Sequence, residues 1–544
     1  MEQGIELNAA LVIEQQPLAQ SHLKYSLRNL GFKQVDFADR AYLATKAINN
    51  KYYDLILCSS DLHSGADGYQ LFEQLVAEKR ILPSNCFVFL SSEASVALSQ
   101  SVLELKPDDF ILKPYSASEI EQRLGRILNK KLALRKVFKE IDRNDFVGAS
   151  EQLHLYVKEE GSDALTPYVL KLKGELLVLL KQWPIGKRFF NRVCEMQPFP
   201  WAQIGQVNCL IELGELDEAE KKLEFMLRSP MTKLQSLDLL TRICKQRSDF
   251  EQASHYVKQA IDIAPRNLTR LNDMVQISRL LHDFKSQFSA SNSLVRQLRN
   301  SVHDKPDHYL SAIRSNIDYG LTSLNEEEVG RLAQQSQGML KNLRKLFPGE
   351  PLNDQIDVAQ ARIYNLRNEK DKAKSIMFRW LDKIDRHQNY INNLEDGLDQ
   401  AKALHELGFF DESERVFNDL SIYCQLTKSD LVTSQYISEE RQLRIDIKES
   451  PKELNNKAVG FFKHGNYAHA LDSFELAFKL MPKSPAIALN LMQSAIESNL
   501  INFDRDKLMG TVEKCKKAIS VSKLNSEQLN RYDKLNEMLE VKLA

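Results

Sequence analysis

The sequence predicts two architectures in succession, a doubly wound α/β domain over residues 1–130 and then an all-α solenoid of helical hairpins. Short apolar runs alternate with helical patterns up to the end of the first segment, which is typical of strand and helix in alternation. Strand signals then disappear, and small residues and turn residues recur at a near-constant interval. Together these observations predict an α/β fold followed by helical repeats.

Short runs rich in apolar residues recur in the first segment, and the uninterrupted run at 10–13 suits a parallel strand that is buried on both faces. The predicted strands cover residues 10–13, 35–37, 55–58, 87–90 and 110–112. Apolar residues at helical spacing predict helices over 18–30 and 41–49, and Gly31 ends the first of them. Because strand and helix alternate, we expect a parallel sheet whose ligands bind at the carboxyl ends of the strands.

Polar residues stand at several of these strand ends. Glu14 and Gln15 follow the first strand, and Ser59 follows the apolar residues of the third strand. Ser91 follows the fourth strand, and Lys113 comes directly after the fifth and before a proline. In order and spacing these residues resemble the receiver domains of bacterial response regulators, a flavodoxin-like fold.

The resemblance implies a role for each position. In receivers, two acids and an acceptor aspartate hold Mg²⁺, and the aspartate takes a phosphoryl group while a hydroxyl and a lysine bind it. Glu14 matches the first acid, Gln15 replaces the second, Ser59 stands at the acceptor, and Ser91 and Lys113 match the hydroxyl and the lysine. A serine without a base is a poor nucleophile, and a single carboxylate makes a poor Mg²⁺ site. We therefore expect a degenerate receiver with no cofactor, and only a weak case for Mg²⁺.

Two residues near the site leave alternatives open. Asp61 lies two positions beyond Ser59, and a bulge in the chain would bring it to the site as an alternative phosphoacceptor. Strand residues alternate between faces and register is tightly set, so a surface turn is the favoured position for Asp61. Phe110 stands at the aromatic switch position of receivers, although core packing is the commoner role for such a residue.

The second segment contains a recurring helical motif. Residues 458–482 match nearly every signature position of a tetratricopeptide repeat (TPR), namely Ala458, Phe461, Gly465, Ala470, Phe474, Ala477 and Pro482. Weaker copies place Ala219 and Ala253 34 residues apart, which is the repeat length of that family. We expect TPR-like repeats over 131–290, an irregular helical spacer over 291–350, and further repeats with a capping helix over 351–544. Such arrays bind protein partners on a concave face.

Composition narrows the function classes. The net charge is −1, which implies no general attraction to nucleic acid, and the seven cysteines have no metal-binding or disulfide spacing. No apolar run is long enough for membrane insertion, and the N-terminus lacks the pattern of a signal peptide. No nucleotide-binding or hydrolase motif is present. We expect a cytoplasmic protein that is not an enzyme.

The combination of a degenerate receiver and TPR repeats resembles atypical response regulators of the VieB-like kind. The resemblance implies a non-enzymatic regulator in a phosphorelay that binds a sensor histidine kinase, a phosphotransfer protein or another response regulator. One alternative is a phosphorylated switch that uses Asp61. Another alternative is a structural adaptor of a cell-envelope or motility assembly. The sequence is also compatible with a protein that forms a homodimer.

Overall fold

The computed structural model describes most of the chain, which forms two compact units. The described residues are 7–62, 67–92, 104–160, 166–299, 301, 303–384, 393–427, 431–498, 505–520 and 524–543. One unit comprises residues 1–270 and 298–304, and the other comprises 271–297 and 305–544. The helix expected between the fourth and fifth strands lies largely outside the described residues.

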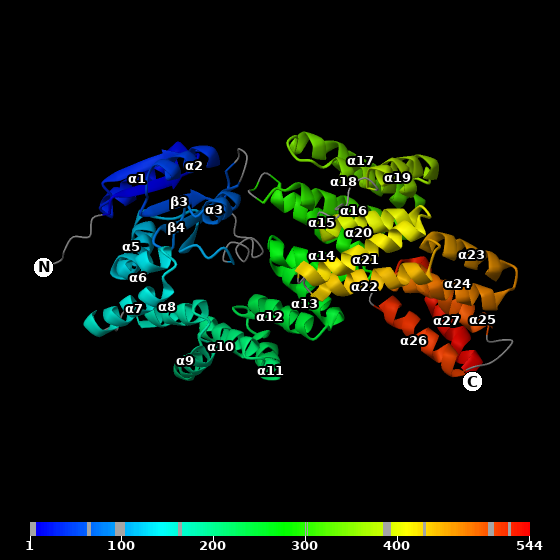
Figure 1. Ribbon diagram of the computed structural model, residues 1–544. Helices are drawn as coiled ribbons and strands as arrows, with labels where there is room; N and C mark the ends of the chain where they lie inside the picture. The colour runs from blue at the N-terminus through cyan, green and yellow to red at the C-terminus, as the bar shows by residue number, and fades with distance from the viewer. Residues whose placement is uncertain are drawn as a thin grey trace. The chain divides into compact units, whose positions relative to one another are not determined.

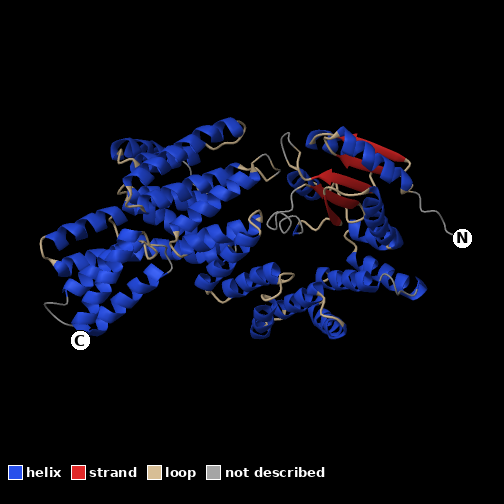
Figure 2. Ribbon diagram, turned by 180° about the vertical axis from the view of Figure 1, so that it is seen from behind, coloured by secondary structure: helices blue, strands red, loops and turns tan. Residues whose placement is uncertain are grey.

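The N-terminal domain of the first unit is built on a parallel five-stranded sheet (Figures 1 and 2). Its strands are β1 (Ala9–Ile13), β2 (Gln34–Ala38), β3 (Leu55–Ser59), β4 (Cys86–Ser91) and β5 (Asp109–Leu112). They lie in the order β2-β1-β3-β4-β5, and every neighbouring pair is parallel. This order is that of the flavodoxin-like doubly wound fold, so the predicted α/β fold is confirmed.

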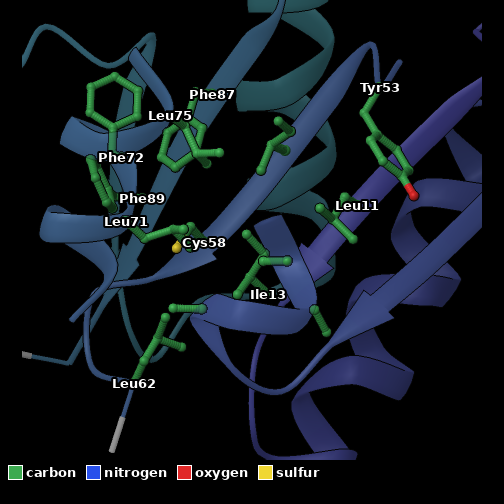
Figure 3. Close-up of a cluster of buried hydrophobic side chains, with 14 of the residues drawn as sticks. Leu11, Ile13, Tyr53, Cys58, Leu62, Leu71, Phe72, Leu75, Phe87 and Phe89 are labelled. Atoms are coloured by element: carbon green, nitrogen blue, oxygen red, sulfur yellow. The ribbon is translucent and has the colours of Figure 1, made fainter. Parts of the chain in front are cut away.

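Helices cover both faces of the sheet. They are α1 (Pro17–Asn29), α2 (Ala41–Asn50), α3 (Gly68–Ala77) and α5 (Ala117–Ala133). Successive residues of β1 alternate between two cores: Leu11 and Ile13 pack with α2 and α3, whereas Ala10 and Val12 pack with α1 and α5. Figure 3 shows the first core, where Phe72 of α3 meets Phe87 and Phe89 of β4. Because both faces of β1, β3 and β4 are buried, these strands contain continuous apolar runs.

The rest of the first unit is helical. After α5 the chain forms α6 (Arg135–Asp142), α7 (Phe146–Glu160), α8 (Thr166–Leu179), α9 (Trp183–Met196), α10 (Pro200–Glu212), α11 (Leu216–Met226), α12 (Lys233–Gln246) and α13 (Phe250–Ile263). Small residues let paired helices approach closely. Ala219 of α11 and Ala253 of α13 are both fully buried. The helix α14 (Leu268–Leu280) begins in this unit and continues into the second.

The second unit is also made of packed helices. They are α15 (Phe284–Leu298), α16 (Pro306–Thr322), α17 (Glu326–Leu346), α18 (Asn353–Leu366), α19 (Lys370–Ile384), α20 (Leu394–Glu406), α21 (Phe410–Thr427), α22 (Leu431–Asp446), α23 (Pro451–Lys463), α24 (Tyr467–Leu480), α25 (Pro485–Ser498), α26 (Arg505–Ser520) and α27 (Ser526–Leu543). The predicted all-α region with TPR-like hairpins is therefore confirmed.

Residues 291–350, for which we expect a spacer, contain two long helices. Tyr309, Ile313 and Ile317 of α16 share a core with Leu340 and Leu343 of α17. The polar face of α17 gives that segment its solvated character in the sequence, while its other face is buried as in any helical hairpin.

Turns between paired helices repeat the same backbone conformation. Gly214, Ser248 and His282 all have positive φ angles, and successive members of this series are 34 residues apart. The residue after a helix often adopts this left-handed conformation, which closes the last turn. The repeat thus appears in the backbone even where glycine is absent.

Candidate functional site

The carboxyl edge of the sheet brings together residues from the ends of three strands. Lys113, which follows β5, lies with its Nζ atom 2.6 Å from the Oε2 atom of Glu14, which follows β1. The same Nζ atom donates a 3.3 Å hydrogen bond to the Oγ atom of Ser59, the last residue of β3. Ser59 therefore stands where the lysine reaches the third strand.

Glu14 is almost fully buried, and both of its carboxylate oxygens have partners. The Oε1 atom accepts hydrogen bonds from the backbone N–H groups of Gln15 and Gln16, at 2.9 and 3.1 Å. The Oε2 atom accepts from Lys113. A buried carboxylate needs such partners, since burying it unpaired is costly.

These residues do not fit the Mg²⁺ that the receiver fold implies. The Glu14 carboxylate is already paired, Gln15 carries an amide, and Ser59 carries a hydroxyl. Mg²⁺ prefers clustered carboxylate oxygens and waters. Within the described part of the chain, no three His, Cys, Asp or Glu side chains gather as a metal site. We derive no step through a metal.

Two serines adjoin this ion pair. The Ser60 hydroxyl donates a 2.9 Å hydrogen bond to the Oγ atom of Ser91, and both residues are buried. The Ser60 amide donates to the carbonyl of Leu90, and the Ser60 carbonyl accepts from the amide of Gly68. Ser91 was expected at this edge, whereas Ser60 was missed because serines without a motif carry no signal.

Gly68 is required by close packing at this point. A Cβ atom on this residue would lie 2.2 Å from the carbonyl oxygen of Ser59, so a larger residue would force the start of α3 away from β3. The backbone approach holds the first turn of α3 against the strand end that carries the site.

The two remaining predicted residues lie at the margin of the site. Asp61 is exposed and follows β3, whose pairing with β4 continues in regular register through Ser59 and Leu90. Phe110, in β5, is half-buried and packs against the core between the sheet and helices α2 and α3.

The TPR signature positions lie mainly between paired helices. Ala458, Ala470, Phe474 and Ala477 are buried, and Phe461 packs against the core shared by α23, α24 and α25. Gly465 has a φ of +76° in the turn between α23 and α24, and Pro482 follows the end of α24.

The second unit contains a cavity of about 370 Å³. Its lining includes Asp318, Lys402, His405, Glu440 and Arg444, which are buried or half-buried. The Lys402 Nζ atom donates to Asp318 Oδ2 at 2.9 Å, and Arg444 donates to the Oε2 atom of Glu440 at 3.0 Å. Although burial opposes it, the positive charges of Lys402 and Arg444 lower the pKa of Glu440 to about 2.

A buried arginine lies beside this cavity. Arg362 is 1 % exposed and pairs with Asp318 and Asp399 at 2.7 Å each and with Glu406 at 2.6 Å. These residues come from α16, α18 and α20. The cluster was not predicted from the sequence, because charged residues far apart along a chain do not reveal that they meet.

The N-terminal domain is thus a doubly wound sheet with a lysine, a carboxylate and hydroxyls at its carboxyl edge. The sequence model of the response regulator receiver domain matches residues 10–125. The N-terminal part of this chain is therefore a receiver domain of two-component signalling, followed by a TPR-like helical region.

Curated relatives match the same part of the chain. The transcriptional regulatory protein LytR of Staphylococcus aureus (strain N315) is 26 % identical over 119 residues, which are 22 % of this chain and 46 % of that protein. The transcriptional activator protein IrlR of Burkholderia pseudomallei (strain 1026b) is 28 % identical over 120 residues, 22 % of this chain and 50 % of that protein. The chain thus spans about half the length of these relatives.

Solved structures similar to the two parts of the chain include a receiver and a repeat protein. The signal receiver domain of an HD domain-containing protein from Pseudomonas fluorescens Pf-5 is 18 % identical, with a TM-score of 0.22, over 25 % of this chain and 96 % of that one. A tetratricopeptide repeat protein from Parabacteroides merdae is 12 % identical, with a TM-score of 0.28, over 50 % of this chain and 97 % of that one.

In the described residues, no helix combines the length and the apolar character that a membrane span requires.

Proposed function

We propose that this protein is a non-enzymatic regulator in a two-component or phosphorelay pathway. Its degenerate receiver presents a receiver-like surface to a sensor histidine kinase, a phosphotransfer protein or another response regulator. The TPR-like region binds a protein partner. The protein modulates phosphoryl flow without accepting a phosphoryl group.

The observation that carries the proposal is the pairing at the strand ends. Lys113 forms an ion pair with Glu14, and the hydroxyl within its reach at the end of β3 is that of Ser59, 3.3 Å away. A serine hydroxyl beside a charged lysine lacks the base that would activate it. The site therefore keeps the polar architecture of a receiver without its nucleophile.

Intact mass tests the proposal. The full chain is incubated with Mg²⁺ and a small phosphodonor, and then with a candidate sensor kinase, beside a receiver known to accept phosphate. We expect no phosphoryl adduct on this chain while the control receiver is labelled.

A phosphoryl adduct that is lost in Asp61→Ala would overturn the proposal and establish a phosphorylated switch. Asp61→Asn is the matched second variant, because it keeps the size of the side chain and removes the carboxylate nucleophile. An adduct retained in both variants would place the acceptor elsewhere and would also refute the non-accepting regulator.

A further inference from the structure

The receiver contacts the helical region of its own unit at one corner, the connection between α13 and α14. Two arginines of this corner, Arg266 and Arg270, pair with carboxylates of the receiver. Both arginines and their partners belong to the same compact unit. Neither arginine was singled out in the sequence.

Arg266 contacts the first turn of α3. Its Nη1 atom lies 3.0 Å from the Oδ2 atom of Asp67, and its guanidinium lies 5.4 Å from the ring centroid of Tyr69. Asp67 is also the N-cap of α3 and accepts from the amide of Gln70 at 2.8 Å. One arginine thus binds both a helix cap and an aromatic ring, as a planar cation can.

Arg270 is the more deeply buried of the two, with a side chain that is 4 % exposed. Its guanidinium donates hydrogen bonds to both carboxylate oxygens of Asp238 in α12, each at 2.6 Å. It also donates to the carboxylate of Glu104 in the receiver, where the Nη1–Oε2 distance is 3.0 Å. A buried guanidinium requires carboxylates, and a bidentate pair fixes its orientation. The receiver supplies one of the two carboxylates that this arginine uses.

The contact is connected to the candidate site through Tyr69 and the start of α3. Tyr69 is buried and packs on Phe89 of β4, with ring centroids 5.1 Å apart. Burial raises the pKa of Tyr69, and the nearby hydroxyls of Ser60 and Ser91 oppose this increase. The amide of Gly68, beside Asp67, donates to the carbonyl of Ser60.

We propose that the α13–α14 corner is the intramolecular partner of the site edge of the receiver. The ion pairs of Arg266 and Arg270 hold the corner against the receiver. A change in the arrangement of the candidate site therefore changes how well ordered the corner is, and a change in the corner acts on the site in return. This inference goes beyond the proposed function, because it holds whether or not the site accepts a phosphoryl group.

Hydrogen exchange of the full chain tests this coupling in both directions. Arg266→Ala removes a contact of the corner, and its effect on hydrogen exchange is measured in the receiver segments 55–62 and 67–77. Glu104→Ala removes the receiver carboxylate, and hydrogen exchange is then measured in the helical segment 250–270, where Arg270 keeps Asp238 as a partner. Arg247→Ala is the matched control, because Arg247 pairs with Asp217 and Glu220 of the helical region.

We expect exchange in each distant segment to become about fivefold faster, as loss of one charge-assisted contact gives in a locally opening region. The control is expected to leave receiver exchange unchanged. Coupling of two sites is reciprocal, so both variants must act across the contact. If each variant changes exchange only in its own domain, or if the control acts as strongly on the receiver, the proposal is wrong.

Discussion

Lys113 and Glu14 form the central ion pair of the candidate site, and the pair determines what the neighbouring hydroxyl can do. The ammonium group lies 2.6 Å from the carboxylate and 3.3 Å from Ser59. An ammonium group donates hydrogen bonds and has no acceptor atom. At the scale of single residues, the ion pair therefore joins the ends of β1 and β5 and holds the lysine beside Ser59.

Restoring the missing carboxylates is expected to restore the receiver chemistry. In the double variant Ser59→Asp with Gln15→Asp, three carboxylates would converge with Lys113, which suits Mg²⁺ and a carboxylate nucleophile. We expect a Mg²⁺-dependent phosphoryl adduct from a small phosphodonor, measured by intact mass. The matched control is Ser60→Asp with Gln15→Asp, which adds the same groups one position away. Equal labelling of the control would contradict the assignment of Ser59 as the acceptor position.

His405 makes the second unit sensitive to acid. Burial and the neighbouring charge of Arg444 lower its pKa to about 4, from 6.5 in an unstructured chain. The folded state therefore favours the neutral ring. The contribution of neutral His405 to the free energy of unfolding is complete above pH 6.5 and is lost as the pH falls towards 4. Each pKa unit corresponds to about 1.4 kcal/mol, so the total is roughly 3 kcal/mol.

The thermal midpoint of the variant His405→Gln is accordingly expected to decrease less between pH 7 and pH 4.5 than that of the unchanged protein. His255→Gln, at an exposed position of α13, is the control and should keep the original pH dependence. A variant His405→Gln with the full acid sensitivity would show that another group is responsible.

At the scale of elements, the helical hairpins depend on turns in the left-handed conformation. Gly214 and Gly408 adopt it without strain, whereas Ser248, His282 and Asn368 adopt it with a side chain. A Cβ atom makes this conformation unfavourable by about 1 kcal/mol or more. Tertiary packing of the flanking helices compensates for this cost.

Replacing one of these residues with glycine tests the cost. Ser248→Gly, at an exposed turn, is expected to raise the free energy of unfolding of the first unit by about 0.5–1 kcal/mol, because strain is removed. Ser254→Gly, inside α13, should lower it by a similar amount. Urea unfolding followed by circular dichroism measures both changes. A decrease in stability for Ser248→Gly would show that its turn carries no strain.

At the scale of the whole molecule, the chain divides into two compact units. The first contains the sheet with its two apolar cores, and the second contains a buried cluster of charges around Arg362. Removing one member of such a cluster is strongly destabilising, because the remaining charges lose their partner. The effect should be confined to the unit that holds the cluster.

Arg362→Leu is expected to destabilise the second unit by about 3–5 kcal/mol, because three carboxylates lose a common partner. Scanning calorimetry should show one unfolding transition at lower temperature and the other unchanged. Arg367→Leu, at an exposed position after the same helix, should leave both in place. Equal shifts of both transitions in Arg362→Leu would mean that the two units unfold together.

Much of the fold could be read from the sequence because it depends on local patterns. The apolar run 55–58 corresponds to β3 (Leu55–Ser59), and the signature around Gly465 corresponds to the hairpin of α23 and α24. The interval from 291 to 350 was harder to interpret, since the buried face of α17 is sparse in sequence and becomes apparent only against α16.

The sequence by itself determined the order of strands and helices and the polar residues at the strand ends, among them Glu14, Ser59 and Lys113. Only the tertiary structure decided that Lys113 pairs with Glu14, that Arg362 joins three carboxylates, and that Arg270 bridges Asp238 and Glu104. The physical reason is that periodicity and strand ends are local properties of a chain. Ion pairs between distant residues depend on how the helices and strands pack, and burial then decides which charges must meet.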